Sequence, residues 1–258
     1  MKIGLYANTD KDPNGEVCRA VKAAAQKNGV SVADYKPGEF FDFIVSIGGD
    51  GTILRVAQES AKSGIPILGV NRGTVGFLTE IEPEGLEEAI SKLIKRDYVL
   101  ERRALLDVIV RGEHYHALND AVVMRTNGGR VIGMEIGVNG EHALSITCDG
   151  YIASTPTGST AYSLSAGGAI IAPSAAVIEL TPVNPHALHA RSMVVNSGAD
   201  VTMKYSSGAG ASLFIDGETV LQLKEGDTVS VTGWDLSALF VRLKQKSFYS
   251  RLTDKLNI

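Results

Sequence analysis

A glycine-rich segment, Gly48-Gly49-Asp50-Gly51-Thr52, follows an apolar run and precedes residues with helical spacing. Where a strand of a parallel sheet leads into a helix, such a loop can bind an anion. Its glycines leave the backbone N–H groups accessible, and the helix N-terminus adds positive potential. Gly48, Gly49, Gly51 and Thr52 are therefore candidates for binding a phosphate donor. The sequence contains neither the P-loop pattern G-x-x-x-x-G-K-S/T nor a full G-x-G-x-x-G.

Asp50 is the unusual member of this segment, because a carboxylate repels the phosphate that the surrounding glycines would attract. Two chemical roles would justify that repulsion: the carboxylate acts as a general base, or it binds Mg²⁺. The alternative is structural, with Asp50 capping a helix that begins in a tight turn. The residue types alone leave these interpretations open.

A second segment, from Asp149 to Gly168, concentrates hydroxyl groups. Seven Ser and Thr side chains lie in the span from Ser154 to Ser165, beside Pro and Gly. Hydroxyls on a loop and a helix N-terminus can bind ribose hydroxyls and phosphate oxygens. The structural alternative is a loop rich in Ser and Thr that precedes a capped helix. A nucleophilic serine is disfavoured, because no G-x-S-x-G elbow surrounds these serines.

Two shorter polar groups could complete a site. Asn119-Asp120 stands at the start of an otherwise apolar strand, where Asn119 could read an adenine edge and Asp120 could accept from hydroxyls. A turn at these residues is at least as good an interpretation. Asp216-Gly217-Glu218 follows an apolar strand and is more typical of a hairpin turn than of a site.

The apolar spacing around the glycine-rich segment predicts alternating strands and helices. Strands are predicted at residues 2–7, 30–34, 42–47 and 66–70, and helices at residues 13–28, 53–61 and 83–95. Such alternation is typical of a mostly parallel sheet covered by helices. We therefore predict a Rossmann-like α/β domain over residues 1–98.

From residue 99 the pattern changes to a series of short strands. They are predicted at residues 98–110, 115–124, 131–138, 142–147, 177–180, 193–196, 201–204, 212–215, 228–231 and 239–243, with one helix near residues 160–166. This pattern predicts a C-terminal β-sandwich domain over residues 99–243. Residues 247–256 have helical spacing again, which predicts a tail, residues 244–258, that returns to the first domain.

The composition is that of an ordinary folded protein without an excess of basic residues. Of 258 residues, 44% are hydrophobic, and the formal net charge is −4. We therefore expect neither a nucleic acid nor an anionic membrane as partner. Cys18 and Cys148 fit no metal-binding spacing, and no apolar run reaches the roughly 18 residues of a membrane span. These features predict a cytoplasmic protein without a dedicated metal site.

Together, these segments resemble the NAD kinase family over nearly the whole chain. Residues 48–52 are similar to the family's glycine-rich motif, which diacylglycerol, sphingoid and phosphofructo kinases share, and Asn119-Asp120 is similar to its short Asn-Glu or Asn-Asp motif. The most specific element, Thr155 to Gly168, resembles the signature T-P-T-G-S-T-A-Y-S-x-S-A-G-G. Residues 180–186 and Arg191 also resemble the family, and all of these segments occur in the family's order.

The resemblance implies a role for individual residues. It makes Asp50 the general base that acts on the adenosine-ribose 2′-hydroxyl of NAD, with Gly51 and Arg55 along phosphates and Tyr162 beside the adenine. The full NAD-binding set that it implies is Asp50, Gly51, Arg55, Asn119, Asp120, Arg130, Asp149, Thr160, Ala161, Tyr162, Ser163, Leu164, Ser165 and Asp216. This chain has Thr147 where many members have a basic residue, which weakens the expected contact with the new phosphate of the product.

The resemblance implies an NAD kinase, which transfers the terminal phosphoryl group of ATP, or of polyphosphate, to NAD and yields NADP. It also implies Mg²⁺ that arrives with the nucleotide, and a homodimer or homotetramer. Two alternatives stay open. A lipid kinase would share the glycine-rich loop but would have no need for residues 155–168, and a non-catalytic NAD(P) sensor would have no need for Asp50.

Overall fold

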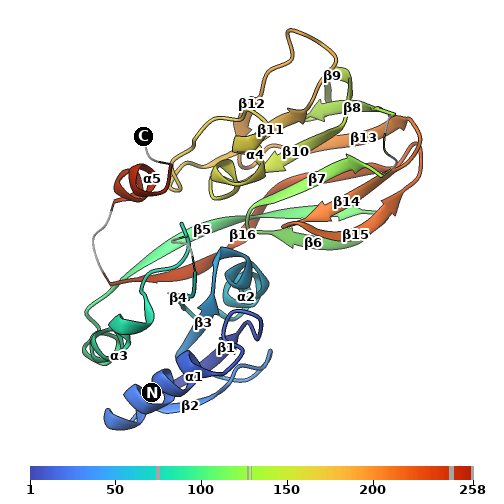
Figure 1. The fold of residues 1–258 in the computed structure, drawn as a ribbon. Coiled ribbons are helices and arrows are strands. Elements are labelled where there is room, and N and C mark those ends of the chain that lie inside the picture. The colour runs from blue at the N-terminus through green and yellow to red at the C-terminus, as the bar shows by residue number, and fades with distance from the viewer. Residues whose placement is uncertain (74–75, 127, 129, 244–246, 257–258) are drawn as a thin grey trace. The chain divides into compact units, whose positions relative to one another are not determined.

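The structure is a computed structural model that describes residues 1–73, 76–126, 128, 130–243 and 247–256. The chain forms two compact units, whose elements are labelled in Figure 1. Unit 1 comprises Met1–Arg103 and Ser237–Ile258, and unit 2 comprises Ala104–Leu236. Two long strands, β5 (Val99–Val110) and β16 (Thr228–Arg242), contribute residues to both units.

Unit 1 is built on a parallel sheet with the strand order β2-β1-β3-β4, and the end of β16 runs parallel to β4. Helices pack on this sheet, and helix α5 is the last element in the described part of the chain. The elements are β1 (Lys2–Ala7), α1 (Glu16–Lys27), β2 (Ser31–Asp34), β3 (Phe43–Gly48), α2 (Asp50–Ser63), β4 (Ile67–Asn71), the short 3₁₀ helix η1 (Pro83–Gly85), α3 (Leu86–Lys95) and α5 (Phe248–Leu256).

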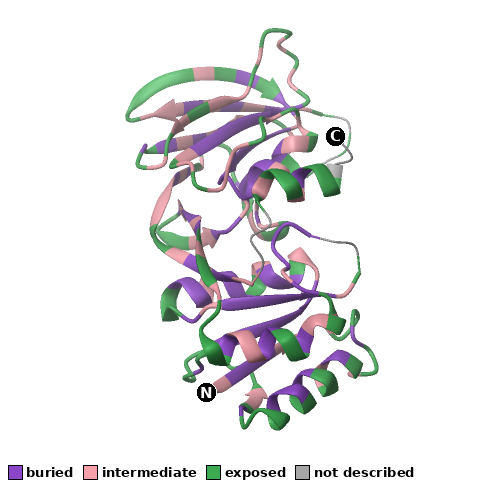
Figure 2. Ribbon diagram, turned by 90° about the vertical axis from the view of Figure 1, so that its left-hand side faces the viewer, coloured by how far each residue is buried: buried purple, intermediate pink, exposed green. Residues whose placement is uncertain are grey.

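Both faces of this sheet are covered, which explains why all six residues of β3 are buried. On one face, the apolar sides of α1 and α3 form a core with Leu68 and Val70 of β4. On the other face, α2 packs so closely on Gly69 that a Cβ atom there would lie 2.7 Å from Cδ1 of Ile53. Figure 2 shows the buried strands and the exposed outer sides of the helices. Because the glycine-rich segment begins where the buried strand β3 ends, it lies at the carboxyl edge of the sheet.

Unit 2 consists of two antiparallel sheets. One has the order β12-β11-β10-β7-β14-β15, and the other contains β16-β13-β8-β9 together with the pair β5-β6. The elements not yet given are β6 (Glu113–Ala117), β7 (Asp120–Arg125), β8 (Ile132–Val138), β9 (Glu141–Cys148), β10 (Gly150–Ser154), η2 (Gly158–Thr160), α4 (Tyr162–Ser165), β11 (Val177–Val183), β12 (Met193–Asn196), β13 (Val201–Ser207), β14 (Ala211–Ile215) and β15 (Glu218–Leu223).

The inner faces of the two sheets share one core, to which Met134 and Met203 contribute from one sheet and Tyr151 and Leu213 from the other. Side chains alternate between the two faces of a strand, so the six-stranded sheet also has an outer face. There Val122, Ile152 and Val183 form a small apolar cluster, against which Met124, Ala166 and Phe214 pack. This outer face carries the candidate site of unit 2.

The predicted fold class, an α/β part followed by an antiparallel β part, is confirmed. The tail also returns to unit 1 as predicted, because Arg251 of α5 forms an ion pair with Glu80. Residues 244–246 and 257–258 of the predicted tail lie outside the described residues. Among the residues that the structure describes, no helix has the length and apolar character needed to cross a membrane.

Several predicted elements have different bounds in the structure. The strand predicted over residues 115–124 is two strands, β6 and β7, because the chain turns at Leu118-Asn119. Residues 228–231 and 239–243 were predicted as separate strands, but residues 228–242 form one continuous strand, β16. Strands β10 and β15 were not predicted. The first helix begins at Glu16 rather than at residue 13, and the Asp12 carboxylate accepts the N–H groups of Val17 and Cys18.

Candidate active site

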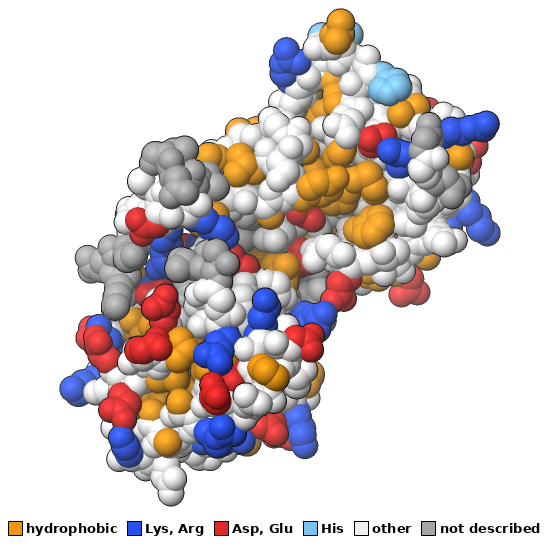
Figure 3. All heavy atoms as spheres, viewed as in Figure 1, with side chains coloured by type: hydrophobic (Ala, Val, Ile, Leu, Met, Phe, Trp, Pro, Cys, Tyr) orange, Lys and Arg blue, Asp and Glu red, His pale blue; other side chains and the backbone are white. Residues whose placement is uncertain are grey.

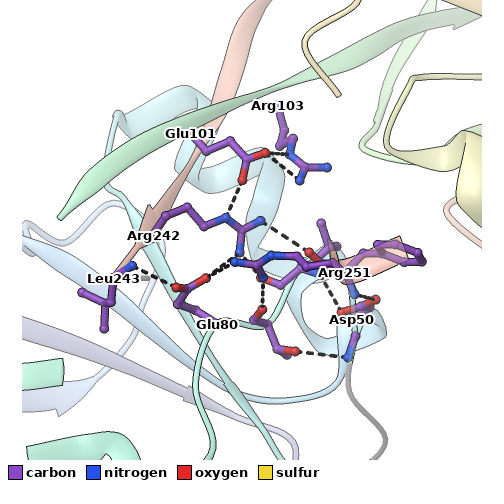
Figure 4. A network of polar contacts seen from close by, with 11 residues as sticks. Asp50, Glu80, Glu101, Arg103, Arg242, Leu243 and Arg251 are labelled. Carbon is purple, nitrogen blue, oxygen red and sulfur yellow. Dashed lines mark hydrogen bonds and ion pairs between the residues drawn. The ribbon is translucent and has the colours of Figure 1, made fainter. Parts of the chain in front are cut away.

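The carboxylate of Asp50 is held by backbone groups from another part of unit 1. Its Oδ2 accepts the N–H of Phe77 at 2.8 Å, and its Oδ1 accepts the N–H of Leu78 at 3.0 Å. The N-cap of α2 is Gly49, which makes no side-chain capping bond. The helix-cap interpretation of Asp50 is therefore wrong, because the carboxylate points to residues 77–78. Figure 4 shows Asp50 and the polar contacts around it.

Gly76 makes room for that carboxylate. A Cβ atom at position 76 would lie 1.9 Å from Oδ1 of Asp50, which is far inside van der Waals contact. No side chain other than hydrogen can occupy this position unless Asp50 moves. Sequence reasoning missed Gly76, because its partner is remote in the chain and Gly76 belongs to no glycine-rich motif.

The glycine-rich loop packs against the protein at Gly48, whereas its backbone has free space beside it at Gly49 and Gly51. At Gly48, where φ is +153°, a Cβ atom would lie 2.2 Å from Oγ1 of the buried Thr52. Thr52 therefore packs beneath the loop and also receives a weak hydrogen bond from Asn8 at 3.5 Å. At Gly49 and Gly51, by contrast, an added Cβ atom would meet nothing within 4 Å. An anion could therefore approach the loop at Gly49 and Gly51.

A group of arginines and glutamates anchors the C-terminal part of unit 1. Glu80, whose side chain is 1% exposed, pairs with Arg242 at 3.2 Å and with Arg251 at 2.6 Å. Glu101 pairs with Arg242 and, at 2.8 Å, with Arg103 (Figure 4). Because charges of both signs are buried together, each compensates the desolvation of its neighbours. The network ties β16 and α5 to residues 77–80, the segment that also holds Asp50.

In unit 2, Asp216 organises the turn between β6 and β7. Its carboxylate accepts the N–H groups of Leu118 at 2.9 Å, Asn119 at 2.7 Å and Asp120 at 3.2 Å. Asp216 lies in the hairpin between β14 and β15 with φ of +50°, a conformation that Asp and Asn tolerate better than most residues. Its predicted hairpin position is observed, and its carboxylate fixes the backbone of Asn119-Asp120.

Asp120 is a buried carboxylate beside this turn, with 5% exposure. Burial and, to a smaller extent, the negative charge of Asp216 together raise the pKa of Asp120 to about 7. Burial also raises the pKa of Asp216, although its three backbone hydrogen bonds oppose that shift. At neutral pH this turn therefore holds two close carboxyl groups, one of which titrates near pH 7.

These shifts predict a pH-dependent stability. Between the unfolded pKa of Asp120, 3.8, and its folded pKa of about 7, the folded protein binds more protons than the unfolded protein, so stability falls as pH rises. Asp120→Asn removes this contribution. The measured quantity is the free energy of unfolding of Asp120→Asn minus that of wild type. We expect this difference to be larger at pH 8 than at pH 5 by roughly 2–4 kcal/mol. Urea unfolding at both pH values measures this difference. The exposed Asp200→Asn is the control, and equal differences at both pH values would contradict the prediction.

A pocket of about 320 Å³ lies over the outer face of the six-stranded sheet. Its lining is mostly apolar with a polar rim and consists of Asn119, Asp120, Val122, Met124, Ala161, Tyr162, Phe214, Asp216 and Gly217. In Figure 3, hydrophobic side chains gather on one face of this unit. Such a pocket suits a flat heterocycle whose polar edge faces the rim.

A second pocket, of about 290 Å³, shares Met124 and Tyr162 with the first. Asp149 lines it and accepts from Nε of Arg125 at 2.7 Å and from the amide of Asn184 at 3.0 Å. The two pockets thus form a continuous lining around Tyr162, with a charged end at Asp149. A ligand larger than one ring could occupy both.

The hydroxyl-rich segment packs against the Asn119 turn. Thr155 donates from Oγ1 to the carbonyl of Leu118 at 2.6 Å, and its N–H donates to the carbonyl of Asn119 at 2.9 Å. At Gly158, a Cβ atom would lie 2.1 Å from that same carbonyl oxygen. These contacts explain why Thr155 and Gly158 stand in the hydroxyl-rich segment: they let its backbone touch the backbone of Leu118 and Asn119.

Glu179 is a fully buried carboxylate that sequence reasoning missed. It accepts from the hydroxyl of Ser163 at 2.7 Å and from the N–H of Ala169 at 2.5 Å. A carboxylate inside the predicted apolar strand at residues 177–180 was the available signal. Glu179 thus holds α4 at Ser163 and the segment after it at Ala169, and the Ser163 side chain points to this carboxylate.

The other predicted residues fall into three places. Ala161 and Tyr162 line the first pocket, whereas Thr160 donates to the carbonyl of Thr157, Leu164 is half-buried and Ser165 is exposed. Arg130 is exposed and lines neither pocket. Gly51 and Arg55 are exposed positions on α2 in unit 1. Among the described residues, no cluster of three His, Cys, Asp or Glu side chains could hold a metal ion.

Known proteins share both the sequence and the fold of this chain. The families described as ATP-NAD kinase N-terminal domain and ATP-NAD kinase C-terminal domain match residues 6–98 and 118–243. The NAD kinase of Caldicellulosiruptor bescii is 34% identical over 260 residues, which cover 99% of each chain. An NAD kinase from Archaeoglobus fulgidus in complex with ATP is similar with a TM-score of 0.84 and 28% identity, over 100% of this chain and 99% of that chain. Yeast NADH kinase complexed with NADH has the same fold, with a TM-score of 0.87 and 22% identity over 100% of this chain and 88% of that chain.

Proposed function

This chain belongs to the NAD kinase family, and we propose that Asp50 is the base of its reaction and that the pocket around Tyr162 binds the adenosine of NAD. The protein is a kinase that phosphorylates NAD. We place the transferred group on the adenosine-ribose 2′-hydroxyl, with ATP as donor and NADP as product. The relative solved in complex with ATP supports the choice of donor.

The chemistry requires a base and accurate positioning. A ribose hydroxyl is a poor nucleophile at neutral pH, and phosphoryl transfer depends mostly on alignment and charge stabilisation. In the proposed step, the 2′-hydroxyl gives its proton to Asp50 while its oxygen bonds to the γ-phosphorus. The bond from that phosphorus to the bridging oxygen breaks, and its electron pair leaves with ADP.

The observation that carries this proposal is how Asp50 is held. Each carboxylate oxygen accepts one backbone N–H, which fixes the group and leaves each oxygen a further lone pair. The side chain is 27% exposed, so a substrate hydroxyl can reach it. A carboxylate fixed in this way is suited to accept a proton, because its geometry is set before the substrate arrives.

For NAD, we propose that the adenine lies on the apolar floor of Val122, Met124 and Phe214, beside Tyr162. Asn119 and Asp120 on the rim then bind ribose hydroxyls or the adenine edge. We propose that a second set completes the NAD site, comprising Gly51, Arg55, Arg130, Asp149, Thr160, Ala161, Leu164 and Ser165. We assign Asp216 and Ser163 to positioning, because their side chains bond to the protein itself.

For ATP, we propose that Gly48, Gly49 and Gly51 form the phosphate loop, with Thr52 packed beneath it. We propose that Mg²⁺ enters as part of the nucleotide substrate, because Mg²⁺ in such enzymes is commonly bound through substrate phosphates with few protein ligands. We further propose that residues 1–98 with the tail 244–258 handle the donor and that residues 99–243 bind NAD. We also propose a homodimer or homotetramer that works in the cytoplasm.

Gly76 gives a test of the Asp50 geometry. In Gly76→Ala, the new methyl group takes the space of Asp50 Oδ1 and displaces the base. Because a displacement of about 1 Å can cost up to about a hundredfold, we expect kcat to fall at least tenfold. Steady-state assays measure kcat. Gly85→Ala is the matched control, since a Cβ atom there meets Ile81 at an ordinary 3.6 Å; equal kcat in both variants would contradict the prediction.

The assay that tests the function uses purified protein with ATP, Mg²⁺ and one acceptor at a time. NAD, diacylglycerol and sphingosine serve as acceptors, and NADP or the phosphorylated lipid is measured. We expect NADP formation and no lipid phosphorylation. Lipid phosphorylation without NADP would indicate a lipid kinase, and NAD binding without any transfer would indicate a sensor. Either result would overturn the proposal.

A further inference from the structure

The C-terminal helix brings a lysine to Asp50. In α5, Nζ of Lys255 lies 3.5 Å from Oδ2 of Asp50 and 4.5 Å from the ring centroid of Phe77. Phe77 is also the residue whose N–H donates to that same Oδ2. The ammonium group thus lies beside both the proposed base and one of the residues that hold it.

The position of Lys255 is fixed by the rest of α5. Arg251, one turn earlier on the same side of the helix, donates to the carbonyl of Thr79 at 3.0 Å and pairs with Glu80. The ring of Phe248, at the start of the helix, lies 6.3 Å from that of Phe77. Residues 77–80 therefore hold both Asp50 and α5, and Figure 4 shows Arg251 and Asp50 in this shared network. The positions of α5 and of Asp50 are therefore set by the same segment, residues 77–80.

Phosphoryl transfer at Asp50 would need a cation at this place. The attacking oxygen must lie within about 2.6–3.2 Å of the base and about 3–3.5 Å from the phosphorus. The γ-phosphoryl oxygens then fall near the Asp50 carboxylate, which repels them. The flexible side chain of Lys255 ends 3.5 Å from that carboxylate and is one-third exposed, so its ammonium can reach those oxygens.

We propose that Lys255 is a second catalytic residue, which donates hydrogen bonds to the γ-phosphoryl oxygens while the phosphoryl group moves from ATP to NAD. This inference rests on the proposed role of Asp50. In the step, Asp50 takes the proton of the 2′-hydroxyl, the new O–P bond forms, and the electron pair of the broken bond leaves with ADP. Lys255 keeps its proton throughout and stabilises the charge spread over the moving group.

Stability does not explain this arrangement. A partly exposed ion pair at 3.5 Å contributes little to folding, since solvent screens it and both side chains lose freedom. The helix itself is held by Arg251 and Phe248, which Lys255 substitutions leave in place. Removing the lysine charge should therefore change the rate of transfer and not the fold.

The test compares Lys255→Met, which removes the charge, with Lys255→Arg, which keeps it. Single-turnover phosphoryl transfer is measured at saturating ATP and NAD, together with the Kd for NAD and the Tm. We expect Lys255→Met to slow transfer about 10²-fold, with Kd for NAD and Tm near wild type. Lys255→Arg should recover most of the rate. Lys62→Met, an exposed lysine at the far end of α2, is the matched control and should transfer at the wild-type rate.

Lys255→Met at the wild-type rate would overturn the proposal. So would equal losses in the Met and Arg variants accompanied by a lower Tm, because that pattern indicates a structural role. A third variant, Lys255→Ala, is assayed with added ethylammonium, which we expect to restore part of the rate. The role of Asp50 is tested separately. If Asp50→Asn transfers at the wild-type rate, Asp50 is not the base. If Asp50→Asn is inactive and Lys255→Met is unaffected, only the proposed role of Lys255 is refuted.

Discussion

Asp50→Asn is expected to lower kcat for NADP formation by about 10²–10⁴, because proton removal by a positioned group contributes that much to rate. The substitution keeps the size of the side chain and removes its basicity. It also removes a negative charge that opposes ATP, so the KM for ATP should hold or fall. Steady-state assays of folded enzyme measure both constants.

The structure adds a stability cost to this prediction. An Asn side chain offers one oxygen and one NH₂ group to the two N–H donors of Phe77 and Leu78, so one hydrogen bond is lost and two donors face each other. We expect a loss of roughly 1–3 kcal/mol in the free energy of unfolding. Rates are therefore normalised to the folded fraction. Asp42→Asn, just before the other end of β3, is the matched control, since that exposed carboxylate accepts the N–H of Lys2 at 2.6 Å.

Near-normal kcat in folded Asp50→Asn, with reduced Tm alone, would indicate that Asp50 serves only to hold residues 77–78. The glycine-rich loop would then remain a phosphate loop without a base. The two roles separate cleanly, since one changes kcat and the other changes stability.

Asp216→Ala is expected to raise the Kd for NAD about 10²-fold while the affinity for ATP stays near wild type. The carboxylate of Asp216 accepts three consecutive backbone N–H groups, and its removal leaves them without their acceptor. Each such loss costs about 1–3 kcal/mol, and the turn that presents Asn119 and Asp120 should relax. Calorimetric titration with NAD and with ATP measures the two affinities.

Asp216→Asn keeps the positive φ and one acceptor oxygen, so its loss of NAD affinity should be intermediate. Glu218→Gln, in the same hairpin and exposed, is the control and should bind NAD normally. If folded Asp216→Ala binds NAD as wild type does, Asp216 is not needed to present the Asn119 turn. Equal losses for NAD and ATP would instead indicate general destabilisation.

Local sequence patterns were sufficient for the elements that carry the site. The apolar run into Gly48-Gly49 predicted a buried strand and a helix, and the structure has β3 and α2 there. Such patterns predict strands and helices because the residues that form the pattern lie within one strand or one helix. Helical spacing at residues 247–256 likewise predicted α5.

Contacts between distant residues could not be predicted in this way. Nothing near Asp50 indicates that its partners are the N–H groups of Phe77 and Leu78, or that Gly76 must lack a side chain. Backbone donors leave no trace in residue type, because every residue except proline carries one. The turn between β6 and β7 was an open alternative to one continuous strand, and local residue types could not decide between them, since the acceptor that holds the turn is Asp216, far along the chain.

In the proposed reaction, Asp50 takes the proton from the adenosine-ribose 2′-hydroxyl of NAD. A crystal structure of Asp50→Asn with NAD and a non-hydrolysable ATP analogue tests it most directly, because the slowed variant holds both substrates. We expect the 2′-oxygen within about 2.6–3.2 Å of the residue-50 side chain and in line with the γ-phosphorus. A 2′-oxygen bound beyond hydrogen-bond reach of residue 50, with a different side chain in its place, would contradict it.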